Sequence, residues 1–435
     1  MTAVRLWARL LRATGPRATD VLSAVAFAFA TAALLAVLGG VNAFRVRLET
    51  GAVDPADGAL VLTLSFVAAA LLLPAVWTLA QAAVRLALAR RDDRLAALRL
   101  VGATRSQVSM MAVLDAVAQA LVGVVVGAML ALAVTPGIAR IEFQGLPFTV
   151  AELLPPVWVW LAAGGAVVGI ALVAALASLR RVHVTPLGVA QRVGGKRLSL
   201  WRIAGFLLVV AGYIALVVVD VVPVELTVVI VMISVLVLSY ALIGPLVIQG
   251  VAWLFAKGAR RPETLLAARR VIDDPRGAFN IVGAMSIAVM AGGAASLAPA
   301  TAAPGDPFAV DIATGATLTI AIAGVLGAVL AGIAQSAKVL DQRREHQAMH
   351  KLGVDLPVMQ GAIMRQVALP LLVGVGGAAG MALLLILPTF ALWMGNASSV
   401  LIWALMAVGA VVVTLAATAC ALPLVRRVAT EAVPA

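Results

Sequence analysis

The chain is poor in charged residues. They fill 12% of its 435 positions, whereas hydrophobic residues fill 63% and the mean hydropathy is +1.09. A soluble protein carries about 25% charged residues, because its surface must be hydrated. The shortage of charged residues therefore excludes a protein made of one or two ordinary soluble domains and indicates an integral membrane protein.

Residues suited to redox and metal chemistry are also scarce. The single cysteine, Cys420, falls inside a long apolar run, so neither an internal disulfide nor a redox role is predicted. There are three histidines, and two of them fall with an acid within about one helical turn, at Glu345, His346 and His350. Their spacing differs from the His-Glu-x-x-His pattern of zinc-binding helices, so we expect no metal site.

Long apolar runs, in contrast, recur along the whole chain. A run of about 20 apolar residues can cross a bilayer as a helix. Ten such runs cover residues 21–43, 59–89, 108–135, 157–179, 203–219, 226–255, 279–298, 313–337, 361–390 and 398–425. The expected fold class is an all-α polytopic membrane protein with ten transmembrane helices.

The basic residues lie almost entirely on one side of these spans. Of the 32 Lys and Arg residues, only Arg45, Arg47 and Arg140 fall in the odd-numbered loops. Lys and Arg concentrate on the cytoplasmic side, so both termini are expected in the cytoplasm. The net charge of +12 is then mainly a topology signal, and no nucleic-acid partner is expected. The preference for arginine over lysine and the abundance of alanine are typical of a high-GC bacterium, which favours a bacterial cytoplasmic membrane.

A block of sequence occurs twice. In each copy an apolar run leads into an arginine cluster, a short amphipathic stretch, a glycine and a second apolar run. The copies cover Ala89–Thr104 and Gln342–Asp355, and Gly102 and Gly353 lie 251 positions apart (353 − 102). Gly123 and Gly374 show the same offset (374 − 123). Such self-similarity suggests two parallel repeat units, which often frame the working site of a membrane protein.

Each copy would place a short basic helix on the cytoplasmic side, where a soluble partner could push on it. The alternative is a positively charged loop without a partner. The residues predicted to dock the partner are Arg91, Arg94, Leu98, Arg99 and Gly102 in the first copy, and Arg344, His346, His350, Lys351 and Gly353 in the second. The glycines would let the backbone turn back to the membrane.

The stretch from Arg91 to Gly127 resembles the FtsX-like permease domain of MacB-like (type VII) ABC transporters. The resemblance rests on Arg-x-x-x-Leu-x-x-Leu-Arg-x-x-Gly-Ala-Thr-x-x-x-Val followed by a glycine-containing span. It implies that the block is the coupling element that docks on an ATPase subunit. The second copy is more diverged, at His346, His350 and Val354.

The whole layout is similar to the ten-helix BceB-like permeases of bacitracin and antimicrobial peptide resistance. That group has a large extracellular domain between its seventh and eighth helices. Here the corresponding loop covers only residues 299–312. This departure puts direct capture of a peptide by an outer domain in doubt.

These observations divide the chain into five parts. An N-terminal interfacial helix and the first span occupy 1–57, the first FtsX-like unit 58–192, a middle section 193–298, a short extracellular linker 299–312 and the second FtsX-like unit 313–435. Within the middle section, residues 261–278 are predicted to form an amphipathic helix on the membrane surface, with Pro275 ending it.

Two further features lie within the spans. The glycines at i and i+4 in Gly123/Gly127 and Gly376/Gly380 are small-residue pairs that favour close helix packing. Asp115 is the most deeply embedded acid, and it is either a functional polar site or a residue that hydrogen-bonds to a neighbouring helix.

The chain contains no Gly-x-x-x-x-Gly-Lys-Ser/Thr phosphate-binding motif; the nearest string is Gly194–Arg197. The leading hypothesis is therefore a permease subunit without its own ATPase, which binds no cofactor. ATP and Mg would sit on two copies of a cytoplasmic ABC ATPase, one for each coupling element. The output would be extrusion of an amphipathic peptide, lipid or hydrophobic drug.

Two alternatives remain at this level. The chain could be a mechanotransmission or signalling module that acts on a sensor kinase or a cell-wall hydrolase through a small membrane or extracytoplasmic partner. A secondary transporter is disfavoured, because the spans contain almost no ionisable residue near the bilayer midplane. Surrounding membrane lipid is an expected contact in every case.

Overall fold

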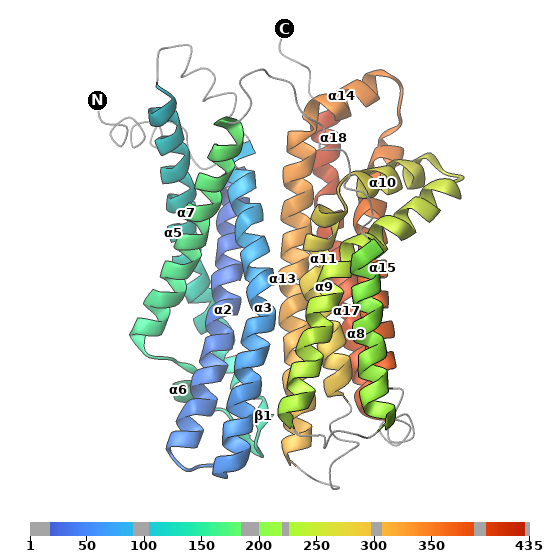
Figure 1. Cartoon of the computed structure of the whole chain (residues 1–435). Coiled ribbons are helices and arrows are strands. Elements are labelled where there is room, and N and C mark those ends of the chain that lie inside the picture. Colours follow the sequence, from blue (N-terminus) through green and yellow to red (C-terminus); the bar gives the residue numbers. More distant parts are fainter. Residues whose placement is uncertain are drawn as a thin grey trace.

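The computed structural model describes residues 18–89, 104–183, 200–219, 226–296, 307–386 and 397–430, and this part of the chain is almost entirely helical (Figure 1). The helices are α2 (Ala18–Glu49), α3 (Pro55–Ala89), α5 (Arg105–Ile138), α6 (Val150–Leu153), α7 (Val157–His183), α8 (Leu200–Val219), α9 (Leu226–Lys257), α10 (Pro262–Asp273), α11 (Pro275–Ala295), α13 (Pro307–Asp341), α14 (Arg343–Lys351), α15 (Leu356–Ile386), α17 (Ala397–Ala419) and α18 (Leu422–Thr430). One two-stranded hairpin pairs β1 (Glu142–Phe143) with β2 (Leu146–Pro147).

The all-α polytopic fold class is confirmed. Within the described ranges, nine helices are long and apolar enough to cross a membrane. The apolar helix α8 occupies the place of the predicted fifth span. Its apolar segment Trp201–Gly212 is shorter than the nine spans. The ten predicted crossings therefore correspond to nine full-length spans and this shorter one.

The long helices form two groups that stand side by side in Figure 1. One group contains α2, α3, α5 and α7, and the other contains α11, α13, α15 and α17, with α8, α9 and α10 beside it. The equivalent helices α3 and α13 each contain 35 residues and begin at a proline. The starts of α5 and α15, at Arg105 and Leu356, keep the sequence offset of 251 (356 − 105).

The observed grouping differs from the one expected from sequence. The first span, α2, packs along α3 and α5, and α11 packs in the same way along α13 and α15. Each group is therefore a four-helix bundle, and the helix that precedes each predicted three-helix unit belongs to it by contact. The middle section is correspondingly reduced to α8, α9 and α10.

The two bundles meet through α3 and α13. One buried apolar cluster contains Leu79, Ala83 and Leu86 of α3 together with Leu330 and Ile333 of α13. These side chains are at most 5% exposed. Helix α3 is followed by the first predicted coupling element and α13 by α14, so the helices before both elements pack against each other.

Gly123 and Gly127 of α5 lie directly against α2. A Cβ atom at Gly127 would lie 2.5 Å from the carbonyl oxygen of Ala28 and 2.7 Å from Cβ of Thr31. A Cβ atom at Gly123 would overlap Cβ of Phe27. The predicted small-residue pair thus allows the backbones of α2 and α5 to approach closely.

The predicted pair Gly376 and Gly380 does not make such a contact, since no heavy atom lies within 4 Å of a Cβ built at either position. The close approach in α15 falls instead at Gly374, where a Cβ would lie 2.8 Å from Oγ of Ser286 in α11. The face of α15 that meets α11 is therefore rotated away from the Gly-x-x-x-Gly face. Gly374 is the residue related to Gly123 by the repeat offset.

The predicted surface helix 261–278 is two helices. Helix α10 ends at Asp273. Pro275, which was predicted to end this helix, is the first residue of the next helix, α11. Asp274 caps α11 by accepting a hydrogen bond from the backbone N–H of Gly277 at 3.0 Å. Helix α10 packs against α9 and α15, which covers Ala267, Ala268 and Val271, whereas Leu265 remains 41% exposed. The predicted N-terminal interfacial helix lies outside the described residues.

We predict that Gly127→Ala destabilises the protein by about 1–3 kcal/mol, because the added methyl group overpacks the contact with the α2 backbone. Gly376→Ala is the matched control, since it adds the same group to an open position of another span. Thermal unfolding in detergent, followed by tryptophan fluorescence, compares them. Equal melting temperatures for the two variants would contradict the packing described here.

Candidate functional site

The second predicted coupling element is folded as the nine-residue helix α14. It lies with α10 and α18 at one end of the molecule, which is called the α14 end below (Figure 1). Helix α13 ends at Asp341 and α14 begins at Arg343, so only Gln342 separates the span from the predicted coupling element.

A glycine turn ends α14 and directs the chain into α15. The N–H of Val354 donates to the carbonyl of Met349, and the N–H of Gly353 donates to that of His350, both at 3.0 Å. Gly353 has a φ of +83°, which an L side chain rarely adopts. This arrangement is a Schellman motif, so Gly353 stops the helix and turns the backbone back toward the bundle.

One side of α14 is fixed to the bundle. His346 and Gln347 are buried, and Gln347 Nε2 donates to the carbonyl of Val428 in α18 at 3.3 Å. Beneath them, Val339, Met359, Ile363, Val425 and Val428 form a separate apolar cluster. Since α13, α15 and α18 all contribute to it, α14 is seated on three helices.

The other side of α14 is open. Glu345, Ala348, His350 and Lys351 are exposed, and Leu352 at the end of the helix is 84% exposed. Leu352 thus lies beside exposed charged groups at the C-terminal end of α14. Of the predicted docking residues in this copy, His350, Lys351 and Gly353 thus reach the surface, whereas His346 does not.

The first predicted coupling element, with Arg91, Arg94, Leu98, Arg99 and Gly102, lies outside the described residues. Its flanks are described, since α3 ends at Ala89 and α5 begins at Arg105. Thr104 and Gln107 form a capping box at the start of α5, in which the Thr104 hydroxyl accepts from the N–H of Gln107 at 3.3 Å. Thr104 and Asp355 are related by the repeat offset, and each lies directly before a span.

Charged groups of α10 lie near α14. Burial lowers the pKa of Arg270, and the negative charge of Glu345 opposes that shift. Burial also lowers the pKa of His346. The contact of its Nδ1 with the carbonyl of Gln342, at 2.8 Å, and the charge of Glu345 act in the opposite direction, whereas Arg270 adds to the lowering.

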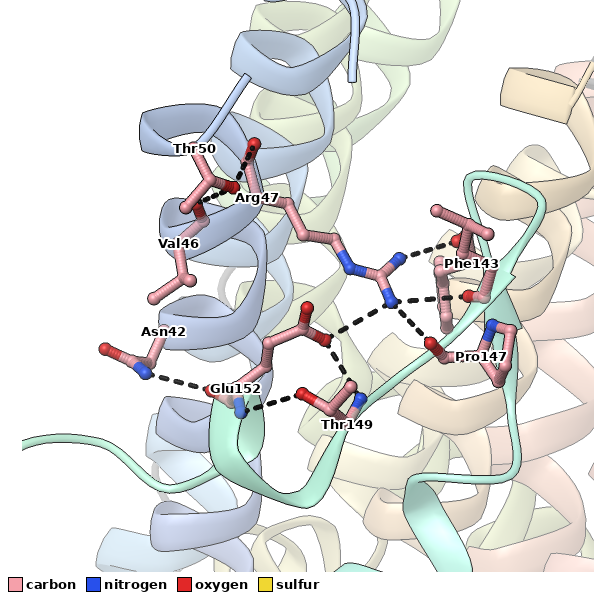
Figure 2. Close-up of polar contacts among 9 residues, drawn as sticks. Asn42, Val46, Arg47, Thr50, Phe143, Pro147, Thr149 and Glu152 are labelled. Atoms are coloured by element: carbon pink, nitrogen blue, oxygen red, sulfur yellow. Dashed lines mark hydrogen bonds and ion pairs between the residues drawn. The ribbon is translucent and has the colours of Figure 1, made fainter. Parts of the chain in front are cut away.

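At the opposite end, called the α6 end, an arginine organises the loop between α5 and α7 (Figure 2). Arg47 of α2 is only 2% exposed. Its guanidinium donates to the carbonyls of Phe143 at 2.7 Å, Pro147 at 2.8 Å and Leu146 at 3.3 Å, and it lies 3.4 Å from Glu152 Oε2. Because backbone oxygens and a carboxylate satisfy the charge, it can be buried.

The loop held by Arg47 has structure of its own. Gln144 and Gly145 have φ values of 58° and 73°, as a two-residue type I′ hairpin turn requires. Phe44, Phe143 and Phe148 pack edge to face or tilted, with centroids 5.3–5.4 Å apart. The sequence indicated a short loop here but not this folded hairpin. The signal was Arg47 itself, one of three basic residues in the odd-numbered loops.

The hairpin also connects the two bundles. The backbone N–H of Gln144 donates to both carboxylate oxygens of Asp311 in α13, at 2.9 and 3.0 Å. Asp311 is 5% exposed. Arg47 therefore holds the hairpin to α2, and the hairpin in turn holds α13. The two bundles are joined by polar contacts at the α6 end as well as by apolar packing along α3 and α13.

Two features considered in the sequence remain, the intramembrane acid Asp115 and metal binding. Asp115 is half-buried and lies two residues inside the apolar window of α5 that begins at Val113, so it is close to the α14 end of that span. No group of three His, Cys, Asp or Glu side chains within the described ranges is placed to hold a metal ion.

We predict that Arg47→Met destabilises the α6 end by about 3 kcal/mol, because three carbonyls and Glu152 lose their partner. Hydrogen exchange of residues 141–154 should become faster. Arg45→Met is the matched control, since Arg45 is exposed and its partners, Glu49 at 3.8 Å and Asn42 Oδ1 at 3.1 Å, belong to its own helix and not to the hairpin. Unchanged exchange in Arg47→Met would show that the arginine does not hold the hairpin.

We predict that acid loosens α14. Because burial lowers the pKa of His346 below its ordinary value of 6.5, the unfolded segment binds a proton more readily than the folded one. The stabilisation is fully present above about pH 6.5 and is lost as the pH falls through the folded pKa. The thiolate is the reactive form of cysteine and becomes rarer in acid, so labelling at Met349→Cys, in a Cys420→Ser background, is compared with that of the unfolded protein at the same pH. The ratio of the folded to the unfolded labelling rate should rise at acidic pH.

In that experiment, His346→Gln should reduce the pH dependence, whereas His350→Gln, which changes an exposed histidine, should retain it. Equal pH profiles in the two variants would assign the effect to another group.

Comparison with known protein families gives one match, in which residues 64–186 match the FtsX-like permease C-terminal family. The matched range runs from the first half of α3 through α5 to the end of α7, and it contains the whole first predicted coupling element. No curated protein and no solved structure matches the chain. Residues 64–186, which provide three of the four helices of the first bundle, are therefore similar to the FtsX-like permease C-terminal family.

Proposed function

We propose that this chain is the membrane subunit of an ABC transporter and that separate cytoplasmic ATPase subunits drive it. The observation that carries the proposal is the match of residues 64–186 to the FtsX-like permease family, together with the sequence block between α3 and α5 that recurs between α13 and α15. FtsX-like permeases work with ABC ATPases, so the expected partner is a pair of such subunits, which would supply the bound ATP and Mg.

The proposed docking surface includes α14, so the α14 end would face the cytoplasm of a bacterial cell. On the sequence repeat, we expect the segment 90–103 to provide the second contact. The firm seat of α14 on α13, α15 and α18 supports this role, because a push on a rigid helix moves the spans behind it. The exposed side chain of Leu352 would provide the apolar centre of the contact, surrounded by Glu345, His350 and Lys351.

The work done on the substrate would take place within the membrane. The described loops at the α6 end are short and form no separate domain there, and the outward faces of α5 and α7 expose apolar residues such as Val125 and Leu161. The exposed apolar residues suit contact with lipid, and the short loops favour a substrate taken from the bilayer, such as an amphipathic peptide, lipid or hydrophobic drug, over one captured by an outer domain. MacB-like coupling, in which the spans do mechanical work, accords with this substrate class.

A second candidate is mechanotransmission to an extracytoplasmic partner. The polar contacts among Arg47, the hairpin and Asp311 favour it, because a folded connection at the α6 end can transmit a change made at the α14 end. A transporter would respond to amphipathic compounds with altered ATP hydrolysis. A mechanotransmission module would respond instead to the presence of its partner.

We predict that Lys351→Glu/Leu352→Asp weakens binding of the partner ABC ATPase by at least tenfold, because both side chains are exposed at the proposed contact. Arg94→Glu/Arg99→Glu tests the first element in the same way. Co-purification and ATP hydrolysis in nanodiscs measure the effect. Arg427→Glu, an exposed charge reversal on α18, is the control. If both double variants bind the ATPase as the wild type does, the assignment of the coupling surface fails.

A further inference from the structure

An open groove lies where α9 turns into α10, on the side of the second bundle. Its volume is about 500 Å³, and its lining includes Leu254 and Phe255 from α9, Arg260 and Arg261 from the connection, and Thr264 from α10. No predicted coupling residue belongs to it. The groove therefore has an apolar wall and a basic rim, and the proposed ATPase contact does not explain either.

The groove lies at the level of a membrane surface. Helix α9 is a candidate span that ends at Lys257, one residue before the connection begins. Nζ of Lys257 lies 3.7 Å from the ring centroid of Trp253, and Trp253 is 49% exposed. Exposed tryptophans and lysines at the end of a span mark the interface between acyl chains and headgroups. Leu254 and Phe255 are 60% and 51% exposed on the hydrocarbon side of this level.

The positive charges of the groove are available to a ligand. Arg260 and Arg261 are both exposed, and within the described part of the chain no carboxylate pairs with either of them. The nearby acid, Glu263, is occupied by Arg365 of α15 at 2.9 Å. The groove therefore presents two arginines toward its opening without a compensating acid.

The far wall of the groove is fixed. The same Arg365 donates to Oγ1 of Thr264 at 2.6 Å, which ties the first turn of α10 to α15. Behind it, Ala267, Ala268 and Val271 are buried against the bundle. The two arginines thus begin a helix whose position is set by packing, and the groove is part of the folded structure.

We propose that this groove binds an anionic glycerophospholipid of the surrounding leaflet, with its acyl chains on Leu254 and Phe255 and its phosphate at Arg260 and Arg261. An ion in solution would use only the basic rim, whereas a lipid uses the rim and the apolar wall together. A zwitterionic lipid fits less well, because its cationic headgroup would lie beside two arginines. Basic pockets between membrane helices commonly bind anionic headgroups in this way.

Native mass spectrometry of the detergent-purified chain, titrated with phosphatidylglycerol or with phosphatidylcholine of the same acyl chains, tests the proposal. The wild type should retain phosphatidylglycerol at least fivefold better than phosphatidylcholine. Arg260→Gln/Arg261→Gln should lose this preference. Arg269→Gln/Arg276→Gln removes the same charge from exposed positions outside the groove lining and should keep it.

Added inorganic phosphate separates the two sources of the anionic group. Retention of phosphatidylglycerol that resists phosphate supports a lipid site, whereas displacement by phosphate would show that the basic rim alone binds an ion. Equal loss of preference in both double variants would mean that net charge, and not the groove, attracts the lipid. Either of these last two results would overturn the proposal, while the ATPase assignment would be unaffected.

Discussion

The apolar contact between α3 and α13 is the constraint on which the rest of the structure depends. These two 35-residue helices form the seam between the bundles, and each leads at the same end of the molecule into a predicted coupling element. Leu79, Ala83 and Leu86 pack with Leu330 and Ile333 in one buried cluster. Because lipid offers no hydrophobic drive for helices to associate, the seam depends on close packing, so a push on either element alters a shared surface.

The α6 end limits what such a push can do. Arg47 binds the hairpin to the first bundle, and the hairpin holds Asp311 of the second bundle through the backbone N–H of Gln144. The bundles are thus connected by side-chain packing along the seam and by directional polar contacts at one end. In the proposed transporter, relative motion at the α14 end would either bend the bundles about this connection or break it. The same geometry serves extrusion of a substrate or transmission of force.

The long apolar runs made most of the fold predictable, because membrane helices must satisfy their backbone hydrogen bonds internally. The glycine turn after α14 was predictable for a similarly local reason. A helix commonly ends at a residue with positive φ, a conformation that glycine adopts readily, and Gly353 has such a φ. Contacts between distant segments were not predictable. Arg47 meets partners about a hundred positions away, and nothing near it indicates them. The pair Gly376/Gly380 has the right spacing, yet packing set the rotation of α15 and brought Gly374 to the contact instead.

The central claim is that this chain converts ATP hydrolysis on bound ABC ATPase subunits into motion of its two bundles. The most direct measurement is ATP hydrolysis by the proposed partner ABC ATPase, alone and after reconstitution with this chain in lipid nanodiscs. The account predicts a stable complex whose hydrolysis rate differs from that of the ATPase alone and changes again with one class of amphipathic compound or with an extracytoplasmic partner. An ATPase that neither binds the chain nor changes its hydrolysis rate would contradict the account.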